Sequence, residues 1–491
     1  MVFLNQTFDI PLFVFMKQVY CIFLFMPLLM FSCDNKDVKG SYIRVSEKNS
    51  RYFEYSSGEP FIPVGPNICW ERFETDEEKI LALYEQRFRI LSENGGNYTR
   101  IWLSAPFFEV EHEEAYKYDE KIIQRISRLL GSADKYGIKV KFCFENFRKL
   151  TGSPAPFSTS VPFDKPIYST ENGGPLESMD DYFSSPEGKK LFLSKAQFIA
   201  SHFADHQAVF GWELWNEINA VSVSDKKIIY DWTKEMLPIV KSLFPNHLVM
   251  QSLGSYDNEN AREMYASYMK MPANEVAQVH RYLDPGAKWD ICQSSMDTLA
   301  YNAVVELLEM TPSKPVVLSE VGAVEANHSG PGKYYESDTL GIILHDLLFA
   351  PFFAGAAGAG QSWHWQYYIE KNNLWWHFER FWNVTISLNP IEEQYTPFLF
   401  TNDDVRYYGL KGKTNIIIWC RDVRCNWETE LENKIAPEQR VTNLSMAKLP
   451  VKDYSGIYLY DPWDNAMKEV FINEGFIPLR FTRSMVIRIN L

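Results

Sequence analysis

Phe210-Gly-Trp-Glu-Leu-Trp-Asn-Glu-Ile-Asn219 is the stretch from which the rest of the chain can be interpreted. It begins as a continuous apolar and aromatic run, which is typical of a parallel strand buried on both faces. It then ends in two polar side chains, Asn216 and Glu217. Burying a carboxylate without a partner is costly, so this pattern favours a Glu at the open end of a strand. On this stretch alone, a Glu that merely caps the following loop is an equally good interpretation.

A second stretch has the same form and changes that balance. Lys314-Pro-Val-Val-Leu-Ser-Glu-Val-Gly322 is another short β-branched run that ends in a carboxylate, Glu320. Two parallel strands that each place one Glu at the carboxyl end are what a two-carboxylate glycosidase needs on a barrel. We therefore take Glu217 and Glu320 as candidate catalytic residues.

The whole-chain composition excludes some classes of partner. The 491 residues carry a net charge of −14, which argues against a nucleic-acid surface or an anionic membrane surface, since both require basic patches. An aromatic content of 15% suits binding of neutral sugars, although large cores use aromatics too. Neither the Cys nor the His residues show metal-ligand spacing, so we expect no metal and no cofactor. Cys420 and Cys425 are close enough in sequence to form a disulfide, but the sequence does not decide whether they do.

The first 32 residues have the features of a targeting segment. Met16-Lys17 precedes an apolar run, residues 19–30, that is short for a membrane span, and a polar stretch follows Cys33. This resembles a bacterial lipoprotein signal, in which Cys33 carries lipid after cleavage. We expect an exported, membrane-anchored bacterial lipoprotein with a polar tether at 33–50; an uncleaved N-terminal anchor is the alternative.

From residue 51 to 393, candidate strands and helices alternate. A hairpin leads into the first strand, and a long irregular segment at 145–185 interrupts the pattern. This alternation predicts an α/β fold, a (β/α)₈ barrel, with that segment as a loop on the active face. The expected strands are 61–66, 98–102, 138–144, the stretch from Phe210, 247–253, 275–282, 315–320 and 355–363; the expected helices are 75–93, which a capping box at Thr75 opens, 119–136, 187–205, 225–244, 258–269, 295–310 and 337–350.

From about residue 394 the pattern changes. Short β-branched and aromatic runs recur with turn residues between them, and no convincing amphipathic helix intervenes. We expect a small all-β domain, a sandwich, at 394–491.

The barrel region resembles glycoside hydrolase family 5 and the wider clan of retaining glycosidases. The most specific match is Trp215-Asn-Glu217 on the fourth strand together with Ser319-Glu-Val-Gly322 on the seventh. Arg100, His280-Arg-Tyr282 and Trp363 follow the family's order on strands two, six and eight. One position departs from the pattern: many members carry a His near the end of strand three, where this chain has Phe144-Glu-Asn146.

The resemblance implies roles for these residues. Glu217 would be the general acid/base and Glu320 the nucleophile of a retaining β-glycosidase. Asn216 would bind the sugar 2-hydroxyl, Arg100 and Tyr282 would hold Glu320 ionised, and Trp363 would be the platform under the sugar. His280 would bind substrate or steady Glu217, and Asn146 is a further candidate for substrate contact. Glu213 lies deeper on the fourth strand, and we interpret it as a structural interior residue.

For some of these residues, a purely structural role stays open. Arg100 could be a salt-bridged barrel residue, His280 a core histidine, and Trp363 core packing. For the whole protein, the leading hypothesis is an enzyme that cleaves β-linked oligo- or polysaccharide, mannan- or glucan-like. Its rival is a non-catalytic glycan-binding lipoprotein that uses the barrel as a scaffold, because function depends on the site and not on the fold. The sequence does not give the oligomeric state.

Overall fold

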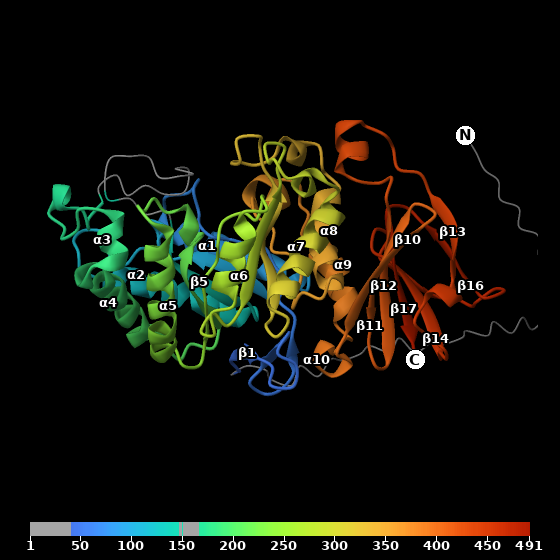
Figure 1. Ribbon diagram of the computed structural model, residues 1–491, viewed down its shortest axis with the longest axis horizontal. Helices are drawn as coiled ribbons and strands as arrows, with labels where there is room; N and C mark the ends of the chain where they lie inside the picture. Colours follow the sequence, from blue (N-terminus) through green and yellow to red (C-terminus); the bar gives the residue numbers. More distant parts are fainter. Residues whose placement is uncertain (1–40, 147–149, 151–165) are drawn as a thin grey trace, which may run out of the picture. The chain divides into compact units, whose positions relative to one another are not determined.

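The computed structural model describes residues 41–146, 150 and 166–491 (Figure 1). The expected signal segment, Cys33 and the first part of the expected tether lie outside these residues. In the part of the chain that is described, no helix is both long and apolar enough to cross a membrane.

A parallel barrel forms the centre of residues 51–393, as the sequence predicts. Two sets of parallel strands make up its wall, one of four strands in the order β4-β5-β6-β7 and one of the pair β8-β9. The strands are buried along their length, which explains the high share of apolar and aromatic residues in their sequences. Their bounds are β4 (Tyr98–Trp102), β5 (Lys139–Asn146), β6 (Val209–Asn216), β7 (Leu248–Met250), β8 (Ala277–Leu283) and β9 (Val316–Ala323).

The first and eighth strands of the barrel are irregular. The first lies near residues 63–69, later than the expected 61–66, because Pro60–Phe61 is β3 of a separate antiparallel sheet. Pro63 and Pro66 have no N–H to give to a ladder, and among the described residues one isolated parallel bridge, Asn67 to Arg100, forms there. Asn67 N donates to Ser362 O at 3.0 Å and joins the first strand to the eighth. The expected eighth strand at 355–363 is present as alternate backbone hydrogen bonds to β9.

Helices cover the outside of this barrel (Figure 1). The first of them starts one residue later than expected: Asp76, and not Thr75, is the N-cap, and its side chain accepts from Lys79 N. The seventh also starts late, at Ile342. These helices are α1 (Glu77–Glu93), α2 (Glu120–Lys135), α4 (Pro186–Phe203), α5 (Lys226–Leu243), α6 (Ala261–Met269), α7 (Met296–Met310) and α8 (Ile342–Phe353).

The segment expected to be an irregular loop, 145–185, contains ordered elements. Its first two residues end β5, and its last part holds a short 3₁₀ turn, η1 (Thr170–Asn172), and helix α3 (Met179–Ser184). Ser178 caps α3 in a reciprocal capping box with Asp181. Tyr182 and Phe183 pack on Trp215 of β6, so this helix covers the end of the fourth strand.

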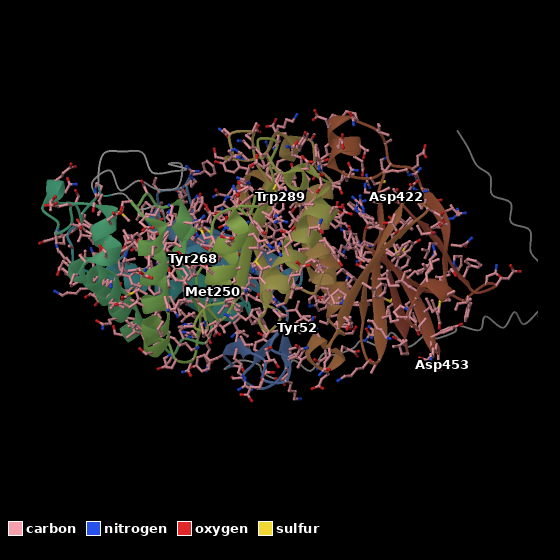
Figure 2. The ribbon with its side chains drawn as sticks, viewed as in Figure 1. Tyr52, Met250, Tyr268, Trp289, Asp422 and Asp453 are labelled. Atoms are coloured by element: carbon pink, nitrogen blue, oxygen red, sulfur yellow. The ribbon has the colours of Figure 1, made fainter. Side chains whose placement is uncertain are left out.

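An antiparallel sheet closes the barrel at the amino ends of its strands. It consists of β1 (Ile43–Val45), β2 (Phe53–Tyr55) and β3 (Pro60–Phe61). Tyr52 and Met250, labelled in Figure 2, belong to the apolar cluster beneath the strands. Residues 41–50 therefore do not continue the polar tether expected at 33–50, because the buried Ile43 holds them on the barrel.

Residues 366–393 form helices that the sequence did not suggest. They are a π-helix, η5 (Gln366–Glu370), then α9 (Trp376–Thr385) and the single turn α10 (Pro390–Glu393). Aromatic residues on several sides of this segment mask the 3.6-residue period that would have predicted a helix.

The C-terminal β region, residues 396–490, is the expected all-β part. Its main sheet has the order β10-β11-β12-β17-β14-β15, and the antiparallel pair β13-β16 packs over it around a second apolar core. Cys420 and Cys425 are free, buried thiols in this region, so they do not form a disulfide. The bounds are β10 (Thr396–Asn402), β11 (Val405–Lys411), β12 (Asn415–Asp422), β13 (Arg440–Ser445), β14 (Gly456–Asp461), β15 (Ala466–Glu469), β16 (Phe476–Phe481) and β17 (Ser484–Asn490).

A buried ion pair joins this β region to the barrel. Arg421 of β12 binds Asp346 of α8 through two parallel contacts, Nε–Oδ1 at 2.7 Å and Nη2–Oδ2 at 2.9 Å. Both side chains are 1% exposed. The described residues form one compact unit by their contacts, which is what such a joint produces. The expected boundary at 393/394 stays a prediction.

We expect Arg421→Met to lower the free energy of unfolding by about 3 kcal/mol, because it leaves a buried carboxylate unpaired. Burial raises the pKa of Asp346 to about 7 although Arg421 opposes it. This folded-state pKa lies above the unfolded one, so ionisation of Asp346 costs stability as pH rises. The loss should therefore be larger at pH 8 than at pH 5 in urea titrations. Arg424→Met, at a half-exposed arginine, should cost less than about 1 kcal/mol; equal losses for both variants at both pH values would contradict this interpretation.

Candidate active site

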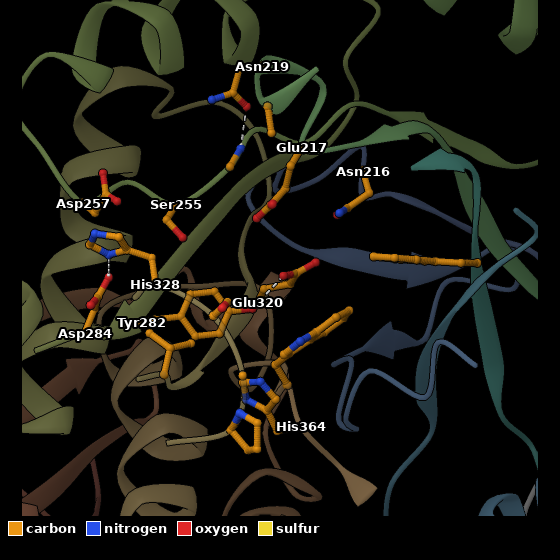
Figure 3. Close-up of a pocket in the computed structure, with 18 of the residues that line it drawn as sticks. Asn216, Glu217, Asn219, Ser255, Asp257, Tyr282, Asp284, Glu320, His328 and His364 are labelled. Carbon is orange, nitrogen blue, oxygen red and sulfur yellow. Dashed lines mark hydrogen bonds and ion pairs between the residues drawn. The ribbon is translucent and has the colours of Figure 1, made fainter. Parts of the chain in front are cut away.

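A cavity of about 560 Å³ opens at the carboxyl ends of the barrel strands. This volume is in the range of small-molecule sites. Glu217 and Glu320 face each other across it (Figure 3). The residues that line it are Trp70, Arg72, Trp102, Asn216, Glu217, Asn219, Ala220, Gly254, Ser255, Asp257, Asn258, Asn260, Ala261, Met264, Tyr282, Asp284, Glu320, Val324, His328, Ser329, Gly330, Pro331, Trp363, His364, Trp365, Gln366 and Tyr367.

Glu217 follows directly after β6, where the chain turns sharply. Its backbone is left-handed, with φ 50° and ψ 52°, which is uncommon for a residue with a Cβ. Its amide N–H donates to Ser252 Oγ at 3.1 Å, and this bond holds the turn. The strained backbone directs the side chain into the cavity, a placement that is common at functional sites.

Glu320 lies within β9 and accepts hydrogen bonds at both oxygens. The Tyr282 hydroxyl donates to Oε2 at 2.7 Å, and Arg100 Nη1 donates to Oε1. The side chain is 4% exposed. Each of Glu217, His280 and Glu320 has a side-chain atom within 4.8 Å of the others, so the two carboxyls share one small space.

The two carboxyl groups have different surroundings. Burial raises the pKa of Glu217 well above its ordinary value, and the nearby Glu320 raises it further. Burial also raises the pKa of Glu320, but there Arg100 and the Tyr282 hydroxyl oppose it by hydrogen bonds to the carboxylate. Glu320 is therefore the member of the pair that loses its proton first, and Glu217 is the one that keeps it.

Arg100 of β4 is the central cation of the site. Its Nη2 lies 2.6 Å from Glu213 Oε2 and 2.7 Å from Asn216 Oδ1, while Nη1 binds Glu320. Arg100 and Glu213 are both fully buried, which confirms Glu213 as an interior residue away from the cavity. Since arginine only donates, Asn216 must present its oxygen to Arg100 and its amide N–H groups to the cavity.

His280 and Tyr282 are adjacent inward positions of β8. His280 Nδ1 lies 2.7 Å from Glu217 Oε1 and 3.5 Å from Glu320 Oε2. Burial lowers the pKa of His280 well below its ordinary value, and Arg100 adds to this, so the imidazole is neutral. Burial raises the pKa of Tyr282, which keeps the phenol protonated as a donor.

Tryptophans form one wall of the cavity. Trp363 lines it at the end of the eighth strand, with its ring centroid 5.3 Å from that of Trp70 and 5.6 Å from that of Trp102. Trp70 and Trp102 line the cavity as well. Trp375 and Trp376 lie at the start of α9 and are not among the described residues that line it.

The end of the third strand differs from what the family pattern suggests. Asn146 Oδ1 accepts from Ser104 Oγ at 2.6 Å, and Asn146 is not among the lining residues of the described chain. Glu145 is fully buried and forms an ion pair with Lys195. A substrate role for Asn146 stays a prediction.

Sequence reasoning missed the loop residues of the site. Asp257, Asp284 and His328 follow strands five, six and seven, and they come within 4.8 Å of one another. His328 Nδ1 lies 2.5 Å from Asp284 Oδ2, and the dashed line in Figure 3 marks this contact. His364 follows Trp363 with a left-handed backbone, φ 58°. These loops carry no periodicity, so only a family alignment could have indicated them.

Among the described residues, two groups of side chains have the composition and spacing to hold a metal ion. One is Glu217, His280 and Glu320, and the other is Asp257, Asp284 and His328. In each, the imidazole already has a carboxylate as its hydrogen-bond partner. Hydrogen bonding within the clusters therefore accounts for both arrangements.

Comparison with known proteins fits this geometry. A sequence profile described as cellulase (glycosyl hydrolase family 5) matches residues 63–341, more than half of the chain. The chain belongs to glycosyl hydrolase family 5. The match covers β4 to β9 and both glutamates, which lie at the ends of the fourth and seventh strands of this family 5 barrel.

Individual relatives of this family 5 protein are distant. Mannan endo-1,4-beta-mannosidase 7 of Arabidopsis thaliana is 23% identical over 289 residues, which is 54% of this chain and 65% of the relative. Mannan endo-1,4-beta-mannosidase F of Aspergillus clavatus is 22% identical over 304 residues, 56% of this chain and 64% of the relative. The chain thus spans just under two thirds of the length of these relatives.

A solved structure supports the architecture over a longer range. The crystal structure of a glycoside hydrolase family 5 protein from Bacteroides vulgatus superimposes with a TM-score of 0.60 at 12% identity, covering 91% of this chain and 93% of that chain. At this identity the likeness concerns the fold, a (β/α)₈ barrel followed by a β-sheet domain.

Proposed function

We propose that this protein is a retaining β-glycoside hydrolase that cleaves β-linked oligo- or polysaccharide by two displacements. The observation that carries the proposal is the position of Glu217 and Glu320. A carboxyl oxygen of each lies within 4.8 Å of a carboxyl oxygen of the other and of a ring nitrogen of His280. Retaining enzymes keep their two carboxyls about 5–5.5 Å apart, whereas inverting enzymes need about 6.5–9.5 Å for a water molecule.

In the first displacement, Glu320 attacks the anomeric carbon and the glycosidic C–O bond breaks. Glu217 gives its proton to the leaving oxygen, so that oxygen departs as a hydroxyl group. In the second, Glu217 takes a proton from water as the water oxygen bonds to the anomeric carbon and Glu320 leaves. Asn216 presents its amide to the sugar 2-hydroxyl, and Trp363 supports the ring.

The substrate class that we propose is mannan-like, with glucan-like polymers as the second choice. Two observations support it: several relatives are named mannan endo-1,4-beta-mannosidases, and the cavity has a tryptophan wall for sugar C–H faces. The rival, a non-catalytic glycan binder, requires neither a proton-holding Glu217 nor a Glu320 held by two donors.

We also propose that the mature protein starts at Cys33 and is held at a bacterial membrane by a lipid on that residue. The apolar run at 19–30 ahead of Cys33 supports this, as does the polar sequence after it.

We expect the wild-type protein to release 4-nitrophenol or reducing ends from one member of a panel of β-mannan, β-glucan, β-galactan and aryl β-glycosides. Proton NMR of the first product should show the β-anomer, because two displacements restore the configuration. An α-anomer as the first product would contradict the nucleophile assignment. Binding without turnover across the whole panel would favour the non-catalytic rival.

A further inference from the structure

A row of four charged side chains crosses the interior of the barrel beneath the cavity. In order it is Lys141 of β5, Glu213 of β6, Arg100 of β4 and Glu320 of β9. Lys141 Nζ lies 3.6 Å from Glu213 Oε2, and the same oxygen lies 2.6 Å from Arg100 Nη2. The row ends at Glu320, which accepts from Arg100.

Lys141 is in an unusual place for a lysine. It is 1% exposed, and its ammonium group donates to Gln278 Oε1 at 2.5 Å. Burying an ammonium ion costs several kcal/mol unless a partner compensates for the loss of water. Glu213 is the anion within ion-pair distance of Lys141 among the described residues, so the two charges depend on each other.

The row is electrically balanced. Glu213 and Glu320 contribute two negative charges, and Arg100 and Lys141 contribute two positive ones. Burial alone would raise the pKa of Glu213, yet Arg100 and Lys141 together hold it below its ordinary value. Burial lowers the pKa of Lys141 to about 8, which leaves the side chain charged below pH 7.

The other groups that face this row do not change the balance. His280 is neutral, and Tyr282 stays a protonated phenol. Cys69 and Cys143 lie close to Arg100, and burial raises both thiol pKa values well above the ordinary one, so they are uncharged. Glu217 is the remaining carboxyl, and it holds its proton in the resting site.

We propose that Lys141 is a positioning residue for the nucleophile: by sharing the charge of Glu213, it allows Arg100 to bind Glu320 and keep it ionised. Without Lys141, one guanidinium would have to serve two buried carboxylates. Glu320 would then take up a proton at a higher pH than in the wild type. The inference rests on the proposed function, in which Glu320 must be ionised to attack.

The test is the acidic limb of the pH profile of kcat/KM, which reports the ionisation of the nucleophile in the free enzyme. The probe is 4-nitrophenyl β-mannoside, or the aryl β-glycoside that the wild type hydrolyses best. Lys141→Met should move the limb up by about one pH unit, which is a tenfold fall in kcat/KM at low pH. Glu213→Gln should move it down, because both cations then act on Glu320.

The double variant Lys141→Met with Glu213→Gln removes both charges and should bring the limb back close to the wild-type position. It should also fold where a single variant fails, because removing both members of a buried pair costs less than removing one. Lys139→Met is the matched control: Lys139 is a buried lysine on the same strand, and its hydrogen-bond partners among the described residues are the carbonyls of Ser41 and Gln207. Its limb should coincide with that of the wild type.

The outcomes separate the two proposals. The positioning role is overturned if the acidic limbs of Lys141→Met and Glu213→Gln move in the same direction. It is also overturned if the acidic limb of the double variant does not return close to the wild-type position. A Lys141→Met limb that coincides with that of Lys139→Met would also overturn it. Failure of the proposed function would show differently, as a wild-type protein that hydrolyses no member of the panel.

Discussion

Glu320→Gln should lose about 10⁴-fold or more in kcat on an aryl β-glycoside. An amide cannot form the glycosyl-enzyme, and removing a nucleophile costs an enzyme most of its rate. Arg100 and Tyr282 hold the carboxylate as hydrogen-bond donors, so they cannot replace it as the nucleophile. The measurement is the steady-state rate of 4-nitrophenol release at the pH optimum, taken after any initial burst, at enzyme concentrations up to the micromolar range.

The fold of this variant should be unaffected. Glutamine has the shape of glutamate and its side-chain oxygen can still accept from Arg100, which also keeps Glu213 as its ionic partner. Thermal melts should therefore show no loss of stability. Glu306→Gln is a suitable control, because Glu306 pairs with Arg281 outside the cavity; it should retain full activity. Turnover by Glu320→Gln within tenfold of the wild type would rule out Glu320 as the nucleophile.

The sequence predicted the regular part of the barrel because burial on both faces leaves a clear pattern. The strands that start at Val209 and Val316 begin as continuous apolar runs, and those that start at Tyr98 and Lys139 are rich in β-branched and aromatic residues. Each of the four is followed by a helix with its own start and stop signals. The carboxyl ends of parallel strands lie at one edge, so Glu217 and Glu320 could be expected to meet although 103 residues separate them.

The first and eighth strands were harder to place for a physical reason. Proline at 63 and 66 removes backbone donors, and the run from Gly355 to Gly360 has almost no side chains to show a face. Both segments are held by tertiary hydrogen bonds, such as Asn67 N to Ser362 O, which a local pattern cannot reveal.

The side walls of the site were not predictable from local patterns. Asp257, Asp284, His328 and His364 lie on loops, where no period links residues that come from different strands. The row that contains Lys141 was equally hidden, because a lysine inside a strand is ordinarily read as an exposed position. Its burial becomes visible only when Glu213 and Gln278 lie opposite it in the closed barrel.

Glu217→Ala should separate substrates by their leaving groups. A sugar leaving group needs a proton from Glu217, so kcat/KM should fall by about 10³-fold on an oligosaccharide. A 2,4-dinitrophenolate needs no proton to depart, so glycosyl-enzyme formation from the dinitrophenyl glycoside should fall by less than about tenfold. Sodium azide should then raise turnover of the dinitrophenyl glycoside and yield the β-glycosyl azide, because the small anion attacks the glycosyl-enzyme without a general base.

The pH profile gives a second, independent sign of the same role. Burial and the nearby Glu320 raise the pKa of Glu217, so the wild type should lose activity as pH rises through that pKa and the acid gives up its proton. Glu217→Ala should lack this basic limb while it keeps the acidic limb that belongs to Glu320. Asn219→Ala, at a lining residue two positions further along that carries no titratable group, should keep both limbs. If Glu217→Ala loses the same factor on both leaving groups and keeps the basic limb, the proton donor must be another residue, and the neutral His280 beside Glu217 would be the first to examine.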